Sequence, residues 1–422
     1  MAGGNKPVRA HPGRKRAPAR KPAGQGVARQ YVLGMFDIRP AADDDREDLA
    51  RLIGFAFNFN VPPEAINPVG KLCAVGSRGL LGTAGVLPFE QWFGGQAVSC
   101  AGIGSVAVSP EARGSGVATQ LMSAALSGQR QAARAVSALY PANAQLYRKL
   151  GYEYGGIRAQ LAVPLPDLPG AKATPVREAG PGDTAALMDC FARYASGHNG
   201  PVSTSDEAYF SERVLAHSGE GVNQRTVLVE GPGGVEGYAS FFTTRHERAV
   251  PSRVTCKHLV ACTPGALAAL LAYFARFVNA IEEFAWYEPP HAPVMAMSLS
   301  SHAFAVTTEV QRWMTRLLDV PAALEGRGYP PVSGRLALSV DDPLFPENAG
   351  PWLLEADGGK VRVSPGESSS RPIPVGTLSA LYTGQASPGD LVLAGALEAD
   401  DERLSLMAAL FSGPAPWMPN FF

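Results

Sequence analysis

No stretch of the sequence has the roughly 18 consecutive apolar residues that a membrane-spanning helix needs, so no such helix is expected. Charged residues are also scarce, at 18% of the chain, and the formal net charge is −1. A chain of this kind does not bind nucleic acid through its overall charge. Apolar residues make up 46% of the chain, which is typical of globular proteins with little disorder.

Cysteine is infrequent, and the spacing of its five occurrences fits no metal-binding pattern. Five is an odd number, and most of these residues lie in apolar segments that we expect to form strands. Buried free thiols in a reducing compartment explain this best, so we expect a cytoplasmic protein without a metal. The cysteines are Cys73, Cys100, Cys190, Cys256 and Cys262.

The first 30 residues contain no acidic side chain but eight Lys and Arg residues, among many Gly, Ala and Pro. This composition predicts a disordered basic arm, to which we assign residues 1–35. The arm has no apolar core, so it does not have the pattern of a signal peptide. A solubilising leader is the interpretation we favour, and electrostatic contact with nucleic acid or an anionic surface is the alternative.

The remaining chain is too long for a single hydrophobic core, and its pattern divides into three units. The first unit, 36–168, predicts the element order β-α-β-β-β-α-β-α, with one helix at 116–134. A Pro/Gly-rich stretch ends this unit and is a good linker. The second unit is 169–305 and the third is 306–422. The fold class is therefore α/β with mixed sheets.

The strongest local signal lies where a strand meets a helix, in "SVAVSPEARGSGVATQLMSAAL" (105–126). Gly114 and Gly116 allow a tight turn and the close approach of a ligand. N–H groups at the start of the following helix attract anions, and Arg113 can add a charge-assisted contact. The turn lacks the glycine pattern of a dinucleotide site and the Lys of a P-loop. It is therefore a candidate pyrophosphate site.

This motif, Arg-x-x-Gly-x-Ala after "VAVSP", resembles the acetyl-CoA signature of the GNAT acetyltransferases. "NAQLYRKLGYEY" resembles the last helix and strand of the same fold. Within that superfamily, "LLDVPAALEGRGY" (317–329) is similar to a segment of the Eis (enhanced intracellular survival) acetyltransferases. The resemblance covers nearly everything after residue 35. It implies tandem GNAT domains, the second of them degenerate, followed by a sterol-carrier-protein-like domain.

The resemblance implies acetyl-CoA as the co-substrate and assigns its contacts. One strand would bind the pantetheine arm, the turn would hold the pyrophosphate, and two residues after the next strand would flank the thioester. In the second unit the equivalent junction, "ACTPGALAAL", lacks the motif, and Pro264 has no N–H to offer. One acetyl-CoA site per chain is therefore expected. The assigned residues are Val106, Ala107, Val108, Arg113, Gly114, Ser115, Gly116, Val117, Ala118, Thr119, Ala142 and Asn143.

Tyr147, in "LYRKLGY", matches the proton donor of the family. When an amine attacks the thioester, CoA leaves as a thiolate that needs a proton. A phenol with a pKa of about 10 is protonated at neutral pH and can supply one. The alternative is that this ring only packs against the edge of the sheet.

A side-chain base is missing from the expected catalytic unit. Residues 36–170 contain no histidine, and "VSCAGIGSVAV" contains no acid. We interpret His258 and His302 as surface or structural residues. In the Eis family the carboxylate of the last residue acts as the base, which assigns this role to Phe422. The apolar ending "WMPNFF" would then anchor that carboxylate, and the alternative is that it only fills a groove.

The acceptor implied by the resemblance is a primary amine of a small molecule. Aminoglycoside-acetylating members have acids where this chain has Phe59, in the first loop, and Phe421. Carboxylates attract polycationic sugars, whereas aromatic rings favour an apolar or aromatic amine. We therefore expect an N-acetyltransferase for aromatic or apolar amines. The alternatives are a protein-lysine acetyltransferase and a non-catalytic acyl-CoA- or lipid-binding protein. The resemblance also implies a homo-oligomer, with hexamers among the family members.

Overall fold

The computed structural model describes residues 36–169, 175–215, 223–245, 251–278, 280–288, 306–367 and 371–422. The basic arm expected at 1–35 and His302 lie outside the described residues.

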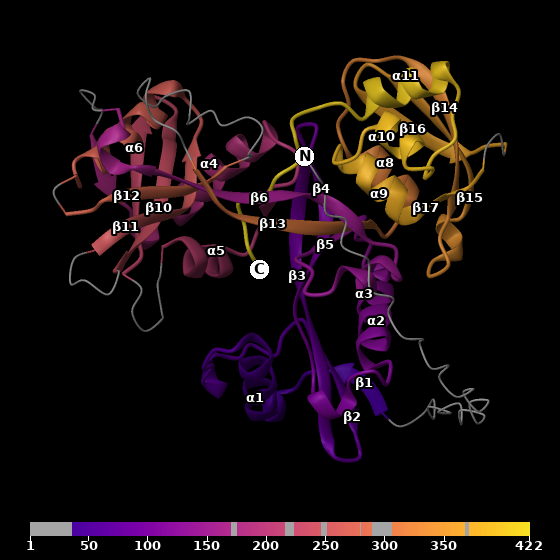
Figure 1. The fold of residues 1–422 in the computed structure, drawn as a ribbon, viewed down its shortest axis with the longest axis horizontal. Coiled ribbons are helices and arrows are strands. Elements are labelled where there is room, and N and C mark those ends of the chain that lie inside the picture. Colours follow the sequence, from indigo (N-terminus) through magenta and orange to yellow (C-terminus); the bar gives the residue numbers. More distant parts are fainter. Residues whose placement is uncertain are drawn as a thin grey trace, which may run out of the picture. The chain divides into compact units, whose positions relative to one another are not determined.

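The first part of the chain follows the predicted order of helices and strands (Figure 1). Its second, third and fourth strands form an antiparallel meander, and the fifth strand is parallel to the fourth. The prediction β-α-β-β-β-α-β-α is confirmed. The elements are β1 (Phe36–Pro40), α1 (Arg46–Phe57), β2 (Lys71–Gly76), β3 (Gly79–Phe93), β4 (Gln96–Val108), α2 (Val117–Gln131), β5 (Val136–Leu139), α3 (Ala144–Arg148) and β6 (Glu153–Pro164).

The second part contributes all of its described strands to the same sheet as the first. In the described chain this sheet has thirteen strands in the order β1-β2-β3-β4-β5-β13-β6-β12-β11-β10-β9-β7, with β8 paired to β3. Thr263 caps α6 and Pro264 is its first residue, as the sequence predicts. The elements are β7 (Val176–Glu178), α4 (Thr184–Ser196), β8 (Val202–Ser203), α5 (Glu207–Val214), β9 (Arg225–Gly231), β10 (Gly234–Arg245), β11 (Pro251–Ala261), α6 (Pro264–Ala275) and β12 (Glu283–Glu288).

The strand that follows the second part differs from the sequence prediction. The sequence predicts that residue 306 opens the third domain, but β13 (Val306–Leu317) belongs to the large sheet (Figure 1). It lies between β5 and β6 and pairs with both of them. Consecutive residues Trp313 to Leu317 are fully buried, so both faces of β13 are covered, as in a central strand.

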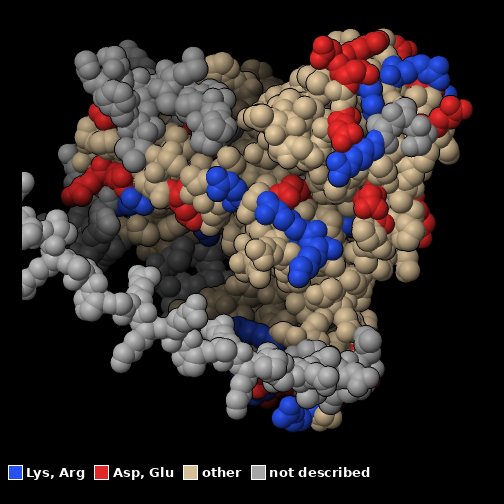
Figure 2. Space-filling view, turned by 45° about the vertical axis from the view of Figure 1, so that its right-hand side comes forward, with Lys and Arg blue, Asp and Glu red and all other residues tan. Residues whose placement is uncertain are grey.

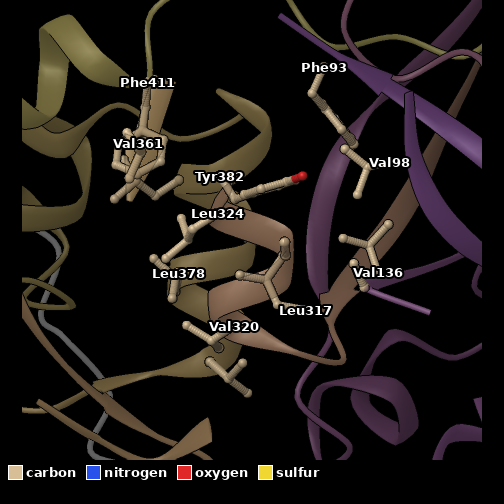
Figure 3. Close-up of a cluster of buried hydrophobic side chains, with 14 of the residues drawn as sticks. Phe93, Val98, Val136, Leu317, Val320, Leu324, Val361, Leu378, Tyr382 and Phe411 are labelled. Atoms are coloured by element: carbon tan, nitrogen blue, oxygen red, sulfur yellow. The ribbon is translucent and has the colours of Figure 1, made fainter. Parts of the chain in front are cut away.

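The described residues of the third part form a separate sheet, in the order β16-β15-β14-β17, together with four α-helices. Its core is continuous with that of the first part, because residues of α8 and α9 pack against β3, β4 and β5 (Figure 3). The rings of Phe93 and Tyr382 meet edge to face at 5.0 Å across this boundary. The elements are α8 (Val320–Gly326), β14 (Gly334–Asp341), β15 (Gly350–Asp357), β16 (Lys360–Pro365), β17 (Ile373–Pro374), α9 (Val375–Thr383), α10 (Pro388–Leu393) and α11 (Asp401–Leu410).

The surface agrees with the balanced charge of the sequence. On the face drawn in Figure 2, basic and acidic side chains are interspersed, with wide uncharged areas between them. Within the described ranges, no helix has the length and apolar character needed to cross a membrane.

The cysteines are free thiols. Cys73, Cys100, Cys190 and Cys256 are buried, and Cys262 is half-buried. The prediction of buried free thiols is therefore confirmed for four of the five residues.

Candidate active site

Strand β4 loses its partner on one side before it reaches the glycine turn. It pairs with β5 only over Cys100–Ile103, whereas its pairing with β3 continues to Val108. A β-bulge precedes the end of the strand, and Ser105 there has a φ of 52°. Among the described strands, none pairs with Val106–Val108 on the β5 side. These are the residues that the resemblance assigns to the pantetheine arm.

The turn after β4 and the start of α2 border an open cavity of about 320 Å³. Gly114 and Gly116 have φ values of 78° and 90°, which side chains disfavour, and a Cβ on Gly114 would meet nothing within 4 Å. No side chain of the described residues caps α2, so its first N–H groups are free to bind an anion. The lining residues are Val108, Ala112, Arg113, Gly114, Gly116, Val117, Ala118, Thr119 and Leu146.

One predicted member of the anion site is turned away from this cavity. The Ser115 hydroxyl donates a hydrogen bond to the Ala112 carbonyl at 2.6 Å, and Ser115 does not line the cavity. Its side chain therefore stabilises the turn itself, because it satisfies a carbonyl within the turn.

Helix α3 places Tyr147 next to this region. The helix starts at Asn143, whose side chain accepts a hydrogen bond from the Gln145 N–H at 3.1 Å, and Ala142 and Asn143 are both exposed. Tyr147 is buried, and its hydroxyl has no hydrogen-bond partner among the described residues. Burial raises the pKa of Tyr147, so the phenol stays protonated at neutral pH.

The last residues of the chain run beside β6. The Ile157 N–H donates to the Pro416 carbonyl, and the Met418 N–H donates to the Ile157 carbonyl, both at 3.2 Å. Trp417 is 2% exposed and Met418 is fully buried. The first residues of the apolar ending "WMPNFF" are therefore buried against the first part of the chain.

Two side chains then hold the backbone of the final residues. The Tyr140 hydroxyl donates to the Asn420 carbonyl at 2.8 Å, and Arg158 Nε donates to the Pro419 carbonyl at 3.2 Å. The Asn420 side chain also accepts a hydrogen bond from the Val202 N–H at 3.2 Å. These contacts come from the residue after β5, from β6 and from β8, so the first and second parts of the chain position the tail together.

Phe422 ends against β4, where two glycines leave room for it. A Cβ on Gly102 would lie 3.1 Å from the Phe422 ring, and a Cβ on Gly104 would lie 3.4 Å from its carboxylate carbon. The ring packs against Phe89, with centroids 5.0 Å apart. The carboxylate forms no ion pair with any described residue. An unpaired carboxylate therefore lies beside the strand that leads to the anion cavity.

Tyr147 and Phe422 lie on opposite faces of β4, near the point where its pairing with β5 ends and leaves an opening between the two strands. Side chains alternate along a strand, so Gly102 and Gly104 face Phe422, whereas Ile103 packs in the cluster that contains Tyr147. A phenol, which can supply a proton, and a carboxylate, which can accept one, are therefore found on the two faces of the same strand.

A second cavity of about 320 Å³ opens at the end of the chain. Its lining combines Pro419–Phe422 with residues of α4, α5, β10 and β11 and with residues of β3, β6, β8, β12 and β13. Phe421 lines it and is 53% exposed, in contact with Tyr140 at 4.8 Å between ring centroids. This surface is the candidate acceptor cavity.

Phe59, the other aromatic residue assigned to the acceptor site, does not line this cavity. Asn58 ends α1 in a left-handed conformation with a φ of 56°, and the Phe59 N–H then donates to the Gly54 carbonyl. Phe59 therefore turns back along its own helix and is 55% exposed, with its ring 6.2 Å from that of Phe57. The structure does not bring Phe59 and Phe421 together at the cavity.

The sequence interpretation missed the basic side chains of the acceptor cavity. Arg158 comes from β6, Arg213 from α5 and Lys257 from β11, and all three line the cavity. His258 lines it too, and its pKa is lowered to about 4 by burial and by the charges of Arg158 and Lys257. No local motif joins these residues, because the sheet assembles them from distant segments.

Known protein families match three parts of the chain. An acetyltransferase (GNAT) domain matches residues 37–155, a further acetyltransferase (GNAT) domain matches 204–317, and a sterol carrier protein domain matches 320–419. A Streptomyces griseus protein named as an uncharacterized N-acetyltransferase is 26% identical over 356 residues, which are 78% of this chain and 83% of that protein.

Solved structures are similar over 92% of the chain. GCN5-related N-acetyltransferases from Anabaena variabilis and Kribbella flavida superpose with TM-scores of 0.86 and 0.81, at 26% and 27% identity, over 100% and 99% of their chains. Eis1 from Mycobacterium abscessus superposes over 100% of its chain with a TM-score of 0.74 at 20% identity, which is a likeness of fold alone.

Proposed function

Because the chain is a GNAT-type N-acetyltransferase with an Eis-like fold, we propose that it transfers an acetyl group from acetyl-CoA to a primary amine of a small molecule. The observation that supports this proposal is that the Phe422 carboxylate lies beside Gly104, while the Tyr147 ring packs with Ile103 on the other face of β4. Acyl transfer from a thioester to an amine is helped by a proton acceptor at the amine nitrogen and a proton donor at the leaving sulfur.

The residues around the opening fit the co-substrate. The unpaired edge at Val106–Val108 offers backbone donors and acceptors for the amide groups of a pantetheine arm. The uncapped start of α2, with Arg113 beside it, suits a pyrophosphate. Ala142 and Asn143, at the end of β5, are exposed and available to flank the thioester end of the arm.

The proposed mechanism assigns one proton transfer to each group. As the amine nitrogen attacks the thioester carbon, the carboxylate of Phe422 takes a proton from the amine, directly or through a water molecule. The C–S bond then breaks, and Tyr147 gives its proton to the leaving sulfur. The products are an N-acetylated amine and the free thiol of CoA.

The second GNAT domain is proposed not to bind acetyl-CoA. At the start of α6, Thr263 Oγ1 accepts a hydrogen bond from the Ala266 N–H at 3.1 Å and donates one to Glu236 Oε2 at 3.0 Å. A capped helix start with a carboxylate beside it does not favour a phosphate. We therefore expect one acetyl-CoA per chain.

An acceptor screen with acetyl-CoA tests the proposed function. We expect CoA thiol release and an acetylated product, identified by mass spectrometry, with aromatic or apolar monoamines, at higher kcat/KM than with kanamycin-like sugars. Acetylation of protein lysines alone would favour the protein-lysine alternative. Binding of acetyl-CoA without turnover of any amine would contradict the proposal.

Replacing Arg113 by Ala tests the anion site. Arg113 is exposed and forms no ion pair with the described part of the chain, so folding is expected to be unaffected. Charge-assisted hydrogen bonds contribute roughly 1.5–3 kcal/mol, so we expect acetyl-CoA binding to weaken at least about tenfold in calorimetric titration. The control is Arg78→Ala, which removes an exposed arginine from the β2–β3 turn. Equal weakening by both variants would mean that only overall charge matters.

A further inference from the structure

The acceptor cavity contains more fixed positive charge than an amine-binding site requires. Arg158, Arg213 and Lys257 line it, and none of them forms an ion pair with any described residue. Its lining has two negative groups, the side chain of Glu309 and the carboxylate of Phe422. Arg158 is buried and Lys257 is half-buried, and cations withdrawn from water are normally paired, so their lack of an ion pair in a cavity indicates a missing anion.

Arg158 is the most deeply placed of the three cations. It is 7% exposed, and its guanidinium lies 3.4 Å from the centroid of the Tyr287 ring. Its hydrogen bonds go to neutral groups, the Pro419 carbonyl and Gln311 Oε1, the latter at 3.1 Å. These partners fix the orientation of the guanidinium but leave its charge uncompensated.

Lys257 and Arg213 extend the positive charge along the cavity. Lys257 Nζ donates to Gln224 Oε1 at 2.9 Å, again a neutral partner. Burial lowers the pKa of Lys257, and the charges of Arg213 and Arg158 lower it further, so the three cations act on one another. Arg213 is exposed and lies over the Tyr209 ring, 5.1 Å from its centroid.

The negative groups do not cancel this charge. Glu309 Oε1 accepts a hydrogen bond from Gln311 Nε2 and pairs with none of the three cations. The Phe422 carboxylate lies against β4 and has no ion-pair partner among the described residues. A polycationic acceptor would therefore meet three like charges in the cavity, whereas a molecule with one amine and one acid would meet complementary charges.

We propose that the acceptor is an aromatic or apolar amine that also carries a carboxylate. The carboxylate of this acceptor lies at Lys257, Arg213 and Arg158, and its amine points toward Phe422. The inference rests on the proposed function and names its substrate class. The rings of Phe421, Tyr209 and Phe242 line the cavity beside the cations and supply the apolar surface. A cavity of about 320 Å³ suits a small molecule of this kind.

Two matched pairs of acceptors test the proposal with the full chain and acetyl-CoA. The pairs are phenylalanine with phenethylamine, and 4-(aminomethyl)benzoate with benzylamine, which place the acid at different distances from the amine. We expect the acid to have at least about tenfold higher kcat/KM than its neutral partner in one pair or both. Higher kcat/KM for the neutral amine in both pairs would overturn the inference but leave the proposed function standing. If none of the four is acetylated, the inference is overturned, and the broader screen decides on the function separately.

Lys257→Gln then tests whether the basic cluster causes the preference. The ratio of kcat/KM for the acid to kcat/KM for its neutral partner is expected to fall about tenfold. The reason is that the amide of Gln keeps the hydrogen bond to Gln224 but lacks the positive charge. Lys360→Gln, at an exposed position on β16, is expected to keep the ratio. Arg213→Gln, at an exposed position, is the second variant if Lys257→Gln lowers the unfolding temperature. A ratio unchanged in both cavity variants would overturn the inference.

Discussion

Adding a single glycine after Phe422 is expected to lower kcat by at least about 100-fold while the affinity for acetyl-CoA stays within about twofold, because a positioned general base contributes roughly 10²–10⁴ in rate. The extension converts the Phe422 carboxylate into a neutral amide and moves the new terminus away from β4. The anion cavity is formed by the turn after β4 and by α2, and no residue of the tail lines this cavity. Steady-state kinetics and calorimetric titration measure the two effects separately.

The expected effect is large because the end of the chain is held tightly. The carboxylate carbon lies 3.4 Å from the position of a Cβ on Gly104, and the Phe422 ring is held by Phe89 and Tyr140, at 5.0 and 5.9 Å between centroids. A further residue has to displace these contacts or leave the site. Either result removes the proposed proton acceptor from the opening.

A substitution in the strand provides a matched control that leaves the terminus unchanged. Gly104→Ala adds a Cβ at ordinary contact distance from Phe422, so it is expected to keep most of the activity. Gly104→Val adds two more methyl groups toward the carboxylate and is expected to lower kcat strongly. The same glycine added before Met1 is expected to have no effect. Normal turnover by the C-terminally extended protein would mean that the tail only fills a groove.

Local features of the fold were predictable from the sequence because their causes are local. Hydrophobic periodicity predicts the element order of the first part, and the preference of Thr and Pro for a helix start predicts α6. The left-handed glycines of the turn, Gly114 and Gly116, follow from the same short-range reasoning, since few other residues adopt that conformation.

Features that depend on long-range pairing were not predictable in the same way. The place of β13 between β5 and β6 depends on partners more than a hundred residues away, and the sequence of β13 alone does not identify those partners. Phe59 was assigned to the acceptor site by loop alignment, but the left-handed Asn58 directs it elsewhere. The basic cluster combines residues of β6, α5 and β11, and its charges lie together only after the two GNAT domains pack.

Replacing Tyr147 by Phe is expected to lower kcat by about 10²–10³-fold, within the range for loss of a general acid, with little change in stability. The variant keeps the ring that packs with Ile103 and Leu139 and removes only a hydroxyl that bonds to no described residue. Steady-state rates of CoA release measure the loss. Equal kcat for Tyr147→Phe and the original protein would contradict the proposed role.

The matched control for this variant is the neighbouring Tyr152, whose ring centroid is 5.9 Å from that of Tyr147. The Tyr152 hydroxyl shares a hydrogen bond of 2.7 Å with Ser137 Oγ. Tyr152→Phe is therefore expected to lower the unfolding temperature while kcat stays close to that of the original protein.

The pH profile of activity is a further test of the role of Tyr147. Burial raises the pKa of Tyr147, so its proton is retained up to and beyond pH ~10, the ordinary range of a phenol. The kcat of the original enzyme is therefore expected to decrease through deprotonation of Tyr147 only above that pH. The pH profile of the Tyr147→Phe enzyme is expected to lack this decrease.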